Sequence, residues 1–135
     1  MPSKTNKTTY LKVEDILIIH VAILDETGGS DGVRDLGRLE AAIAHPQQVV
    51  YGKEIREDIF SKAAAYGFDI IKYHPFVDGN KRTAMTTMAV FLSLNSYTLS
   101  VEKGAIEKMA VDIVEKNMSI EDISTWLKNN SKYSH

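Results

Sequence analysis

The side chains most capable of chemistry lie together in one stretch, residues 74–84, which reads HPFVDGNKRTA. His74 is a base that can take a proton from a hydroxyl group near neutral pH. Asp78 offers a carboxylate oxygen to a magnesium ion carried by phosphate groups. Lys81 and Arg82 supply positive charge, and a guanidinium can hold a phosphate through two parallel hydrogen bonds. These residue types favour a site that binds a phosphorylated ligand and moves a proton.

The proline and glycine of this stretch predict a helix, a short loop and a second helix. Pro75 disfavours a helical conformation at His74, so the apolar periodic run before it should end there. Gly79 permits a turn, Asn80 is a good N-cap, and a second periodic run starts at Lys81. The first backbone N–H groups of this second helix would point into the loop and form a cradle for an anion.

Each of these residues also has an ordinary structural explanation when it is taken singly. A histidine at a helix end is commonly a cap or a solvated side chain, and a Lys-Arg pair is commonly a solvated face. Asp-Gly-Asn is an ordinary turn sequence. His74 and Asp78 have the spacing of a helical metal pair, but Pro75 and Gly79 remove the helix that this spacing needs. The coincidence of all these residues in one stretch favours the functional interpretation.

The apolar periodicity of the chain predicts the helices that position this loop. We expect an all-α, compact bundle of about six helices, with the active loop between the third and fourth, over residues 13–27, 36–44, 55–73, 81–95, 105–114 and 120–127. Ser119 and Asp122 resemble a capping box for the last helix. His20 lies on an apolar face, where we expect a buried histidine with satisfied hydrogen bonds, and Trp126 should anchor the core.

Two segments next to the third helix carry further expectations. His74 falls on the inward-facing stripe of that helix, so we expect its ring to be held by packing. Residues 47–52 (QQVVYG) have extended rather than helical character, which by itself is typical of a surface connector.

Length and composition limit the remaining possibilities. We expect one domain over residues 1–135, with a loose lead-in at 1–9 and a frayed polar tail at 129–135. A net charge of -2 gives no electrostatic reason to expect nucleic acid or a membrane as a direct partner. The chain has no cysteine, no apolar signal core and no run long enough to span a membrane, so we expect a cytoplasmic protein.

The motif in residues 74–82 resembles the signature of the Fic/Doc family, and specifically the Doc (death-on-curing) branch of toxin–antitoxin toxins. Residues 32–42 (GVRDLGRLEAA) extend the likeness, which covers most of residues 10–130. The resemblance implies a Fic-like helical fold with His74 as catalytic base and Asp78 as the magnesium ligand. It implies ATP phosphates bound by Gly79, Asn80, Lys81 and Arg82. Lys72, two residues before His74, is a possible further phosphate contact, although a solvated lysine is the ordinary explanation. Phe76 would anchor the loop, and Gln48, Val49, Val50 and Tyr51 would belong to a flap that docks the target protein.

Lys81 bears on the type of transfer that the resemblance implies. The AMP-transferring branch is similar but has glycine at this position, which leaves room for the nucleotide α-phosphate, whereas the Doc branch has lysine. On this basis we expect a toxin that moves the γ-phosphoryl group of ATP, with Mg2+, to a threonine of a translation factor such as elongation factor Tu, inhibiting protein synthesis. AMP transfer to a protein hydroxyl is the alternative, and a non-catalytic module that binds nucleotide or a partner is a third. The chain has neither a P-loop nor the protein-kinase signature motifs.

Inhibition is expected to come from a partner. The inhibitory helix of the family resembles a Ser/Thr-x-x-x-Glu-x-x-Asn pattern, which we do not find in this chain. A cognate antitoxin would therefore inhibit in trans, through a disordered segment that folds onto the toxin.

Overall fold

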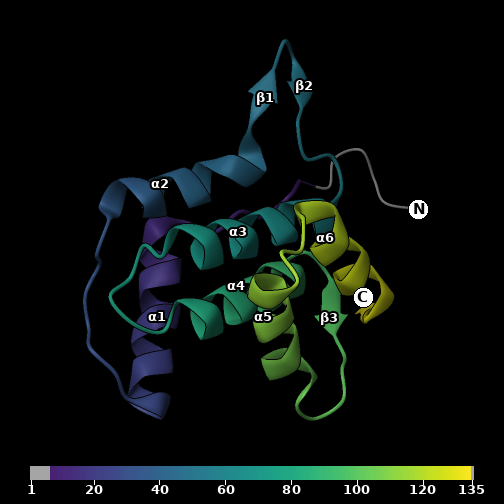
Figure 1. The fold of residues 1–135 in the computed structure, drawn as a ribbon. Helices are drawn as coiled ribbons and strands as arrows, with labels where there is room; N and C mark the ends of the chain where they lie inside the picture. The colour runs from purple at the N-terminus through teal and green to yellow at the C-terminus, as the bar shows by residue number, and fades with distance from the viewer. Residues whose placement is uncertain (1–6, 135) are drawn as a thin grey trace.

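A computed structural model describes residues 7–134, which form six α-helices and four short strands (Figure 1). The helices are α1 Val13–Thr27, α2 Leu36–Ala44, α3 Ile59–Tyr73, α4 Asn80–Leu94, α5 Ala105–Glu115 and α6 Ile120–Asn129, with a 3-10 turn η1 at His45–Gln47. The expectation of a mostly helical bundle with the loop between α3 and α4 is confirmed. No helix in this described part of the chain has both the length and the apolar character that a membrane crossing requires.

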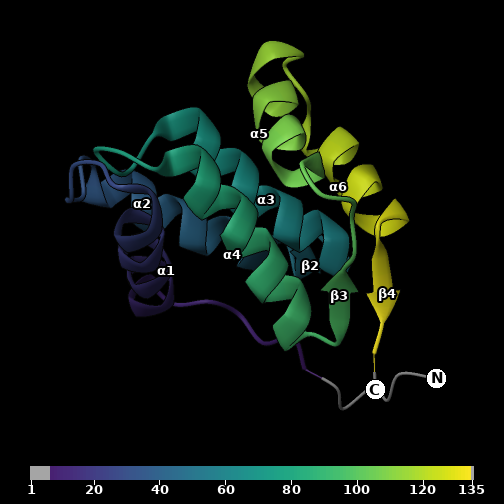
Figure 2. The same ribbon diagram turned by 90° about the horizontal axis from the view of Figure 1, so that it is seen from below.

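Helix α3 forms the centre of the molecule and packs against α2, α4 and α6 (Figures 1 and 2). Its residues 63–66 are fully buried, and so are Met88 and Phe91 on α4. Gly67 of α3 faces Met88 so closely that an added Cβ would overlap the methionine side chain. Helices α3 and α4, which flank the loop, are therefore held together by tight packing.

Helix α3 begins four residues later than the periodicity predicted. Asp58 caps it, with its side chain accepting a hydrogen bond from the backbone N–H of Ser61 at 2.8 Å. Ile55 lies before this cap, in the connector that follows a strand. The apolar pattern could not show this start, because Ile55 has the right spacing but the cap decides where the helix begins.

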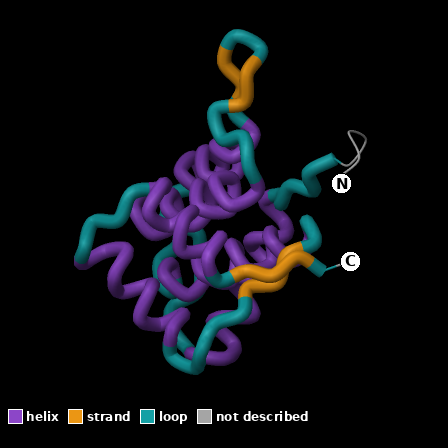
Figure 3. The backbone as a smooth tube through the Cα atoms, turned by 90° about the vertical axis from the view of Figure 1, so that its right-hand side faces the viewer, coloured by secondary structure: helices purple, strands orange, loops and turns teal. Residues whose placement is uncertain are grey.

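The extended segment after η1 forms a hairpin that projects from the helical body (Figures 1 and 3). Strand β1 (Val49–Val50) pairs antiparallel with β2 (Lys53–Glu54), which confirms the extended character expected of residues 47–52. The ammonium group of Lys62, buried on α3, fixes the base of the hairpin by donating to Oε1 of Glu54 and to the carbonyl of Arg56.

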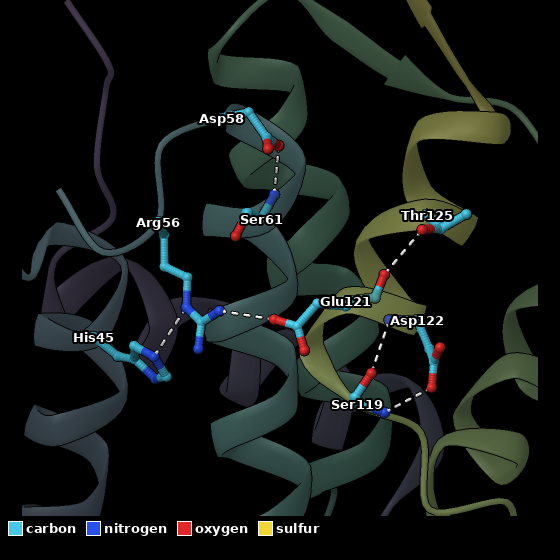
Figure 4. A network of polar contacts seen from close by, with 8 residues as sticks. All are labelled: His45, Arg56, Asp58, Ser61, Ser119, Glu121, Asp122 and Thr125. Carbon is cyan, nitrogen blue, oxygen red and sulfur yellow. Dashed lines mark hydrogen bonds and ion pairs between the residues drawn. The ribbon is translucent and has the colours of Figure 1, made fainter.

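A second set of contacts joins this base to the helices around it (Figure 4). Arg56 donates from Nε to Nε2 of His45 at 3.3 Å and from Nη1 to Oε2 of Glu121 at 3.1 Å. Nδ1 of His45 in turn donates to Oδ2 of buried Asp69 at 2.8 Å. The hairpin base is thus attached to η1, α3 and α6.

The frayed tail expected at residues 129–135 is wrong for the part that the structure describes. Strand β4 (Ser131–Tyr133) pairs antiparallel with β3 (Tyr97–Leu99), and the two strands lie side by side in Figure 2. The rings of Tyr97 and Tyr133 are 5.3 Å apart in an edge-on arrangement. The tail is ordered because a strand distant in sequence pairs with it, a contact that its polar composition does not reveal.

Three further expectations concern the N-terminal lead-in, the start of α6 and the packing of Trp126. Residues 1–6 of the expected lead-in lie outside the described residues, whereas Thr9 exchanges two backbone hydrogen bonds with the side chain of Asn95. The Ser119–Asp122 capping box of α6 is confirmed. Trp126 is partly buried and packs against the core, as expected.

Candidate active site

The loop between α3 and α4 borders a cavity of about 510 Å³. Its walls come from the end of α1, from the glycines that follow it and from the loop itself. The lining residues are Thr27, Gly28, Gly29, His74, Val77, Asp78, Gly79, Asn80, Lys81 and Arg82. Most of residues 74–82 therefore border this one cavity.

His74 ends α3 in a left-handed backbone conformation, with φ 48° and ψ 61°. Its N–H still donates to the carbonyl of Ile70 at 3.2 Å, so the residue closes the last helical turn. The expectation that packing would hold the ring is wrong, because His74 is exposed. The left-handed conformation takes the residue out of the helical spacing from which the inward stripe was inferred. Exposure leaves the ring accessible to a hydroxyl of another molecule.

Two buried side chains, Phe76 and His20, fix the position of the loop. Phe76 is fully buried, and its ring stacks on that of His20 with centroids 3.8 Å apart and planes 9° from parallel. Nε2 of His20 lies 2.8 Å from the backbone carbonyl of Asp78, to which the ring donates. His20 is 2% exposed, so the expected buried histidine with a satisfied hydrogen bond is present, and it fixes the loop.

Asn80 has a different local role from the one that the sequence suggested. Gly79, with φ 79°, is the N-cap of α4, and Asn80 is the first residue of the helix. The Asn80 side chain accepts from the N–H of Phe76 at 3.0 Å and donates to the carbonyl of Phe76 at 2.9 Å. The side-chain amide of Asn80 therefore stabilises the conformation of the loop. Its backbone N–H lies in the first turn of α4, where N–H groups have no partner within the helix.

The first turn of α4 presents positive charge to the cavity. The first backbone bond that closes this turn runs from the N–H of Thr83 to the carbonyl of Gly79. The N–H groups before Thr83 therefore have no partner within the helix. Lys81 and Arg82 are exposed, and neither forms an ion pair within residues 7–134. Such a helix terminus with two uncompensated cations is suited to binding phosphate groups.

Asp78 is the carboxylate of this loop that could hold a metal ion. One of its carboxylate oxygens, Oδ2, accepts from the N–H of Ser30 at 2.9 Å, which holds the exposed side chain at the cavity wall. The described residues contain no group of three or more acidic, histidine or cysteine side chains that could form a complete protein site for a metal. One carboxylate that acts together with phosphate oxygens is the usual arrangement for magnesium.

Lys72 does not line this cavity. It is exposed on α3, with Nζ 5.5 Å from the ring centroid of Phe68, and it borders a second cavity of about 390 Å³. His74 and Lys81 border both cavities. Lys72 thus shares the second cavity with His74 and Lys81, but it does not border the cavity that Asp78, Asn80 and Arg82 line.

The four residues of the expected flap lie on the β1–β2 hairpin or directly before it, away from both cavities. Gln48 is exposed, Val49 is 57% exposed, Val50 is 45% exposed and Tyr51 is 99% exposed. Exposed apolar side chains on a short two-stranded ribbon are suited to pairing with an extended peptide.

Sequence reasoning missed the role of residues 32–35, which precede α2. The guanidinium of Arg34 donates from Nε to the carbonyl of His74 at 2.7 Å and from Nη2 to that of Tyr73 at 2.6 Å. The backbone N–H groups of Arg34 and Asp35 both donate to the carbonyl of Pro75, at 2.7 and 3.0 Å. The only signal in the sequence was that residues 32–42 also resemble the Fic/Doc family. No local pattern shows which carbonyl groups Arg34 and Asp35 contact.

The sequence of this chain matches known proteins of one family. The sequence profile described as the Fic/DOC family matches residues 10–92. Toxin Doc of Mycolicibacterium smegmatis is 40% identical over 95 residues, which cover 70% of this chain and 71% of that protein. Protein kinase doc of Escherichia phage P1 is 29% identical over 119 residues, which cover 88% of this chain and 93% of that protein. The motif loop, the helical fold and these matches together show that the chain belongs to the Fic/Doc family of toxins.

Proposed function

We propose that this protein is a toxin that transfers the γ-phosphoryl group of ATP to a hydroxyl of a protein target. The observation that carries the proposal is the juxtaposition of an accessible His74 with the first turn of α4, where Lys81 and Arg82 border the same cavity. The relative named as a protein kinase supports phosphoryl transfer over other reactions. By the family likeness, the target is a threonine of translation elongation factor Tu, whose modification would stop protein synthesis in the cytoplasm.

In this reaction His74 accepts the proton of the target hydroxyl as the hydroxyl oxygen attacks the γ-phosphorus. The bond between the γ-phosphorus and the β–γ bridging oxygen breaks, and ADP leaves with the electron pair. The open N–H groups of α4, Lys81 and Arg82 stabilise the negative charge on the transferring and leaving phosphates. Asp78 would hold Mg2+, which when bound neutralises charge on the phosphate oxygens. Positioning and charge stabilisation then supply most of the catalysis.

The flap would bring the target hydroxyl to His74. An extended segment of the target would pair with the exposed edge of the β1–β2 hairpin, while its side chains contact Val49, Val50 and Tyr51. The base of the hairpin is fixed by Lys62 and Arg56, so this surface has a defined position relative to α3.

Regulation would come from a cognate antitoxin. The chain lacks the inhibitory Ser/Thr-x-x-x-Glu-x-x-Asn pattern, so no segment of this sequence supplies a glutamate to Arg82 in that way. The relative named as a toxin supports the assignment to a toxin–antitoxin pair. The antitoxin would block nucleotide or target binding in trans.

AMP transfer is the second candidate, and the 390 Å³ cavity favours it. That cavity borders His74 and Lys81, and its lining includes apolar residues of α3 and α5, among them Phe68, Ile71 and Ile113. A nucleoside placed there would present its α-phosphate, rather than its γ-phosphate, to the loop.

The test uses purified elongation factor Tu, ATP and magnesium, with the modified residue identified by mass spectrometry. We expect a phosphoryl group on a threonine, and no modification with His74→Ala. An adenylyl group would favour the second candidate. Nucleotide binding without modification of elongation factor Tu or of any protein in a bacterial extract would favour a non-catalytic module.

A further inference from the structure

The geometry points to Arg34 as the positioning residue for His74. The inference rests on the proposed function, since it concerns how the base of that reaction is held. Arg34 lines neither cavity, and its guanidinium is hydrogen-bonded to the end of α3. We therefore expect Arg34 to act on transfer through the residues that it holds.

The contacts of Arg34 converge on the end of α3. Its two side-chain hydrogen bonds reach the carbonyls of Tyr73 and His74, at 2.6 and 2.7 Å, and its backbone N–H reaches the carbonyl of Pro75. Both side-chain bonds are charge-assisted and come from one planar group, which fixes orientation as well as distance. Three consecutive peptide carbonyls around the catalytic base are thus held by one residue.

Arg34 is itself held in place by the start of α2. The adjacent Asp35 caps that helix, with Oδ1 accepting from the N–H of Arg38 at 3.1 Å. The N–H of Val77 donates to the carbonyl of Gly32 at 3.0 Å, and Val33 forms a β-bridge with Phe76. The guanidinium therefore projects from a segment that is bonded to the motif loop on both sides of Arg34.

His74 needs this external support because its backbone conformation is unfavourable by itself. A non-glycine residue with φ 48° is strained, and Pro75 disfavours the right-handed helical alternative. The last carbonyls of a helix also carry the negative end of its dipole, which the Arg34 guanidinium offsets. Without Arg34, the peptide planes around His74 would sample other orientations, and the backbone from which the ring projects would no longer be fixed relative to the first turn of α4.

The kinetic test compares Arg34→Gln and Arg34→Lys with the control Arg38→Gln. Arg38 is also next to the end of α3, with its guanidinium carbon 4.5 Å from the Tyr73 ring centroid, but no hydrogen bond joins its side chain to residues 73–75 in the described structure. We expect Arg34→Gln to lower kcat about 100-fold, the typical effect of a small misplacement of a catalytic group, with KM for ATP unchanged. Arg34→Lys should recover part of kcat, because an ammonium can donate to one of the two carbonyls. Arg38→Gln should keep the wild-type kcat.

A second readout does not require activity. The Cα and Cβ chemical shifts of His74 report its φ and ψ, and in Arg34→Gln we expect them to leave the left-handed range while thermal unfolding remains cooperative. If the wild-type protein transfers no group, the proposed function fails, but these shifts still decide whether Arg34 holds His74. The inference would be overturned if the His74 chemical shifts were unchanged in Arg34→Gln. It would also be overturned if this variant raised KM for ATP and kept a normal kcat.

Discussion

At the scale of single residues, Lys81 is the side chain that most directly bears on the chemistry. It is exposed at the first turn of α4 and borders both cavities, so it lies where a nucleotide could approach from either side. A lysine here adds charge and also occupies space beside the loop backbone. These two contributions can be separated by substitution.

We predict that Lys81→Gly loses γ-phosphoryl transfer and gains AMP transfer, because it removes charge and opens the space next to the backbone. Lys81→Ala is the matched control, since it removes the same charge but keeps a Cβ beside the backbone, and should only lose activity. Loss of γ transfer should be about 100–1,000-fold in both variants, the effect of removing one electrostatic stabiliser. The check is transfer of label from α-labelled and γ-labelled ATP. A Lys81→Gly variant that still moved only the γ label would show that this position does not select the reaction.

Asp69 provides a residue-scale prediction outside the active site. Burial raises the pKa of this carboxyl above its ordinary value of 3.8, although the hydrogen bond from His45 acts in the opposite direction. The carboxyl of Asp69 thus keeps its proton to a higher pH in the folded protein than in the unfolded chain. Its contribution to stability is therefore lost as pH rises from the pKa of the unfolded chain through the pKa of the folded protein. We predict that the free energy of unfolding of the wild type, minus that of Asp69→Asn, declines as pH rises above about 4. Urea unfolding in a series of buffers measures this difference, and a difference that increased with pH would contradict the assignment.

At the scale of elements, the β1–β2 hairpin combines an exposed tip with a firmly attached base. Tyr51 at the tip is 99% exposed, whereas Lys62 below the base is 1% exposed. A two-stranded ribbon of this length is only marginally stable alone, so its position depends on the contacts at its base.

We predict that Lys62→Met releases the hairpin while leaving the helical core folded. Methionine keeps the buried apolar stem but removes the donor that reaches Glu54 and the carbonyl of Arg56. Local protection of residues 48–57 from amide hydrogen exchange should fall by about 1.5–3 kcal/mol, the typical contribution of hydrogen bonds that involve a charged group. KM for the protein target should rise while KM for ATP stays constant. Exchange rates equal to those of the wild type would show that other contacts fix the hairpin. Lys128→Met, which replaces an exposed lysine, is the control and should leave these rates unchanged.

The α3–α4 pair gives a second element-scale prediction, through two glycines on helices. An alanine at Gly67 would overlap Met88, whereas an alanine at Gly37 of α2 would make only an ordinary contact with Asp35. We predict that Gly67→Ala lowers the free energy of unfolding by about 1–3 kcal/mol despite the better helix propensity of alanine. Gly37→Ala should raise it by up to about 1 kcal/mol. Chemical denaturation of both variants checks this, and equal effects would contradict the close packing of α3 on α4.

At the scale of the whole molecule, the features that the sequence predicted well are those with local signals. Pro75 marks the end of α3, Ser119 and Asp122 mark the start of α6, and the apolar spacing of α1 and α2 marks their bounds. The grouping of residues 74–82 around one cavity also follows from their closeness in sequence. Local turns and caps depend on neighbouring residues, so they can be inferred without the fold.

The features that the sequence could not predict join distant segments. The bonds of Arg34 to the end of α3 and of His20 to the carbonyl of Asp78 span 39 to 58 positions along the chain. The β3–β4 pairing, which orders the C-terminal tail, is of the same kind. The exposure of His74 was missed because helical spacing stops applying once the backbone turns left-handed.

In the proposed reaction, His74 and the first turn of α4 move the γ-phosphoryl group of ATP to a protein hydroxyl. The most direct test adds the protein to a bacterial extract with either α-labelled or γ-labelled ATP, with His74→Ala run in parallel. We predict label on protein from the γ position alone, reduced at least about 100-fold in the variant, as expected for loss of a general base. Label from the α position would contradict γ-phosphoryl transfer, and γ label that persists in His74→Ala would contradict the role of His74 as the base.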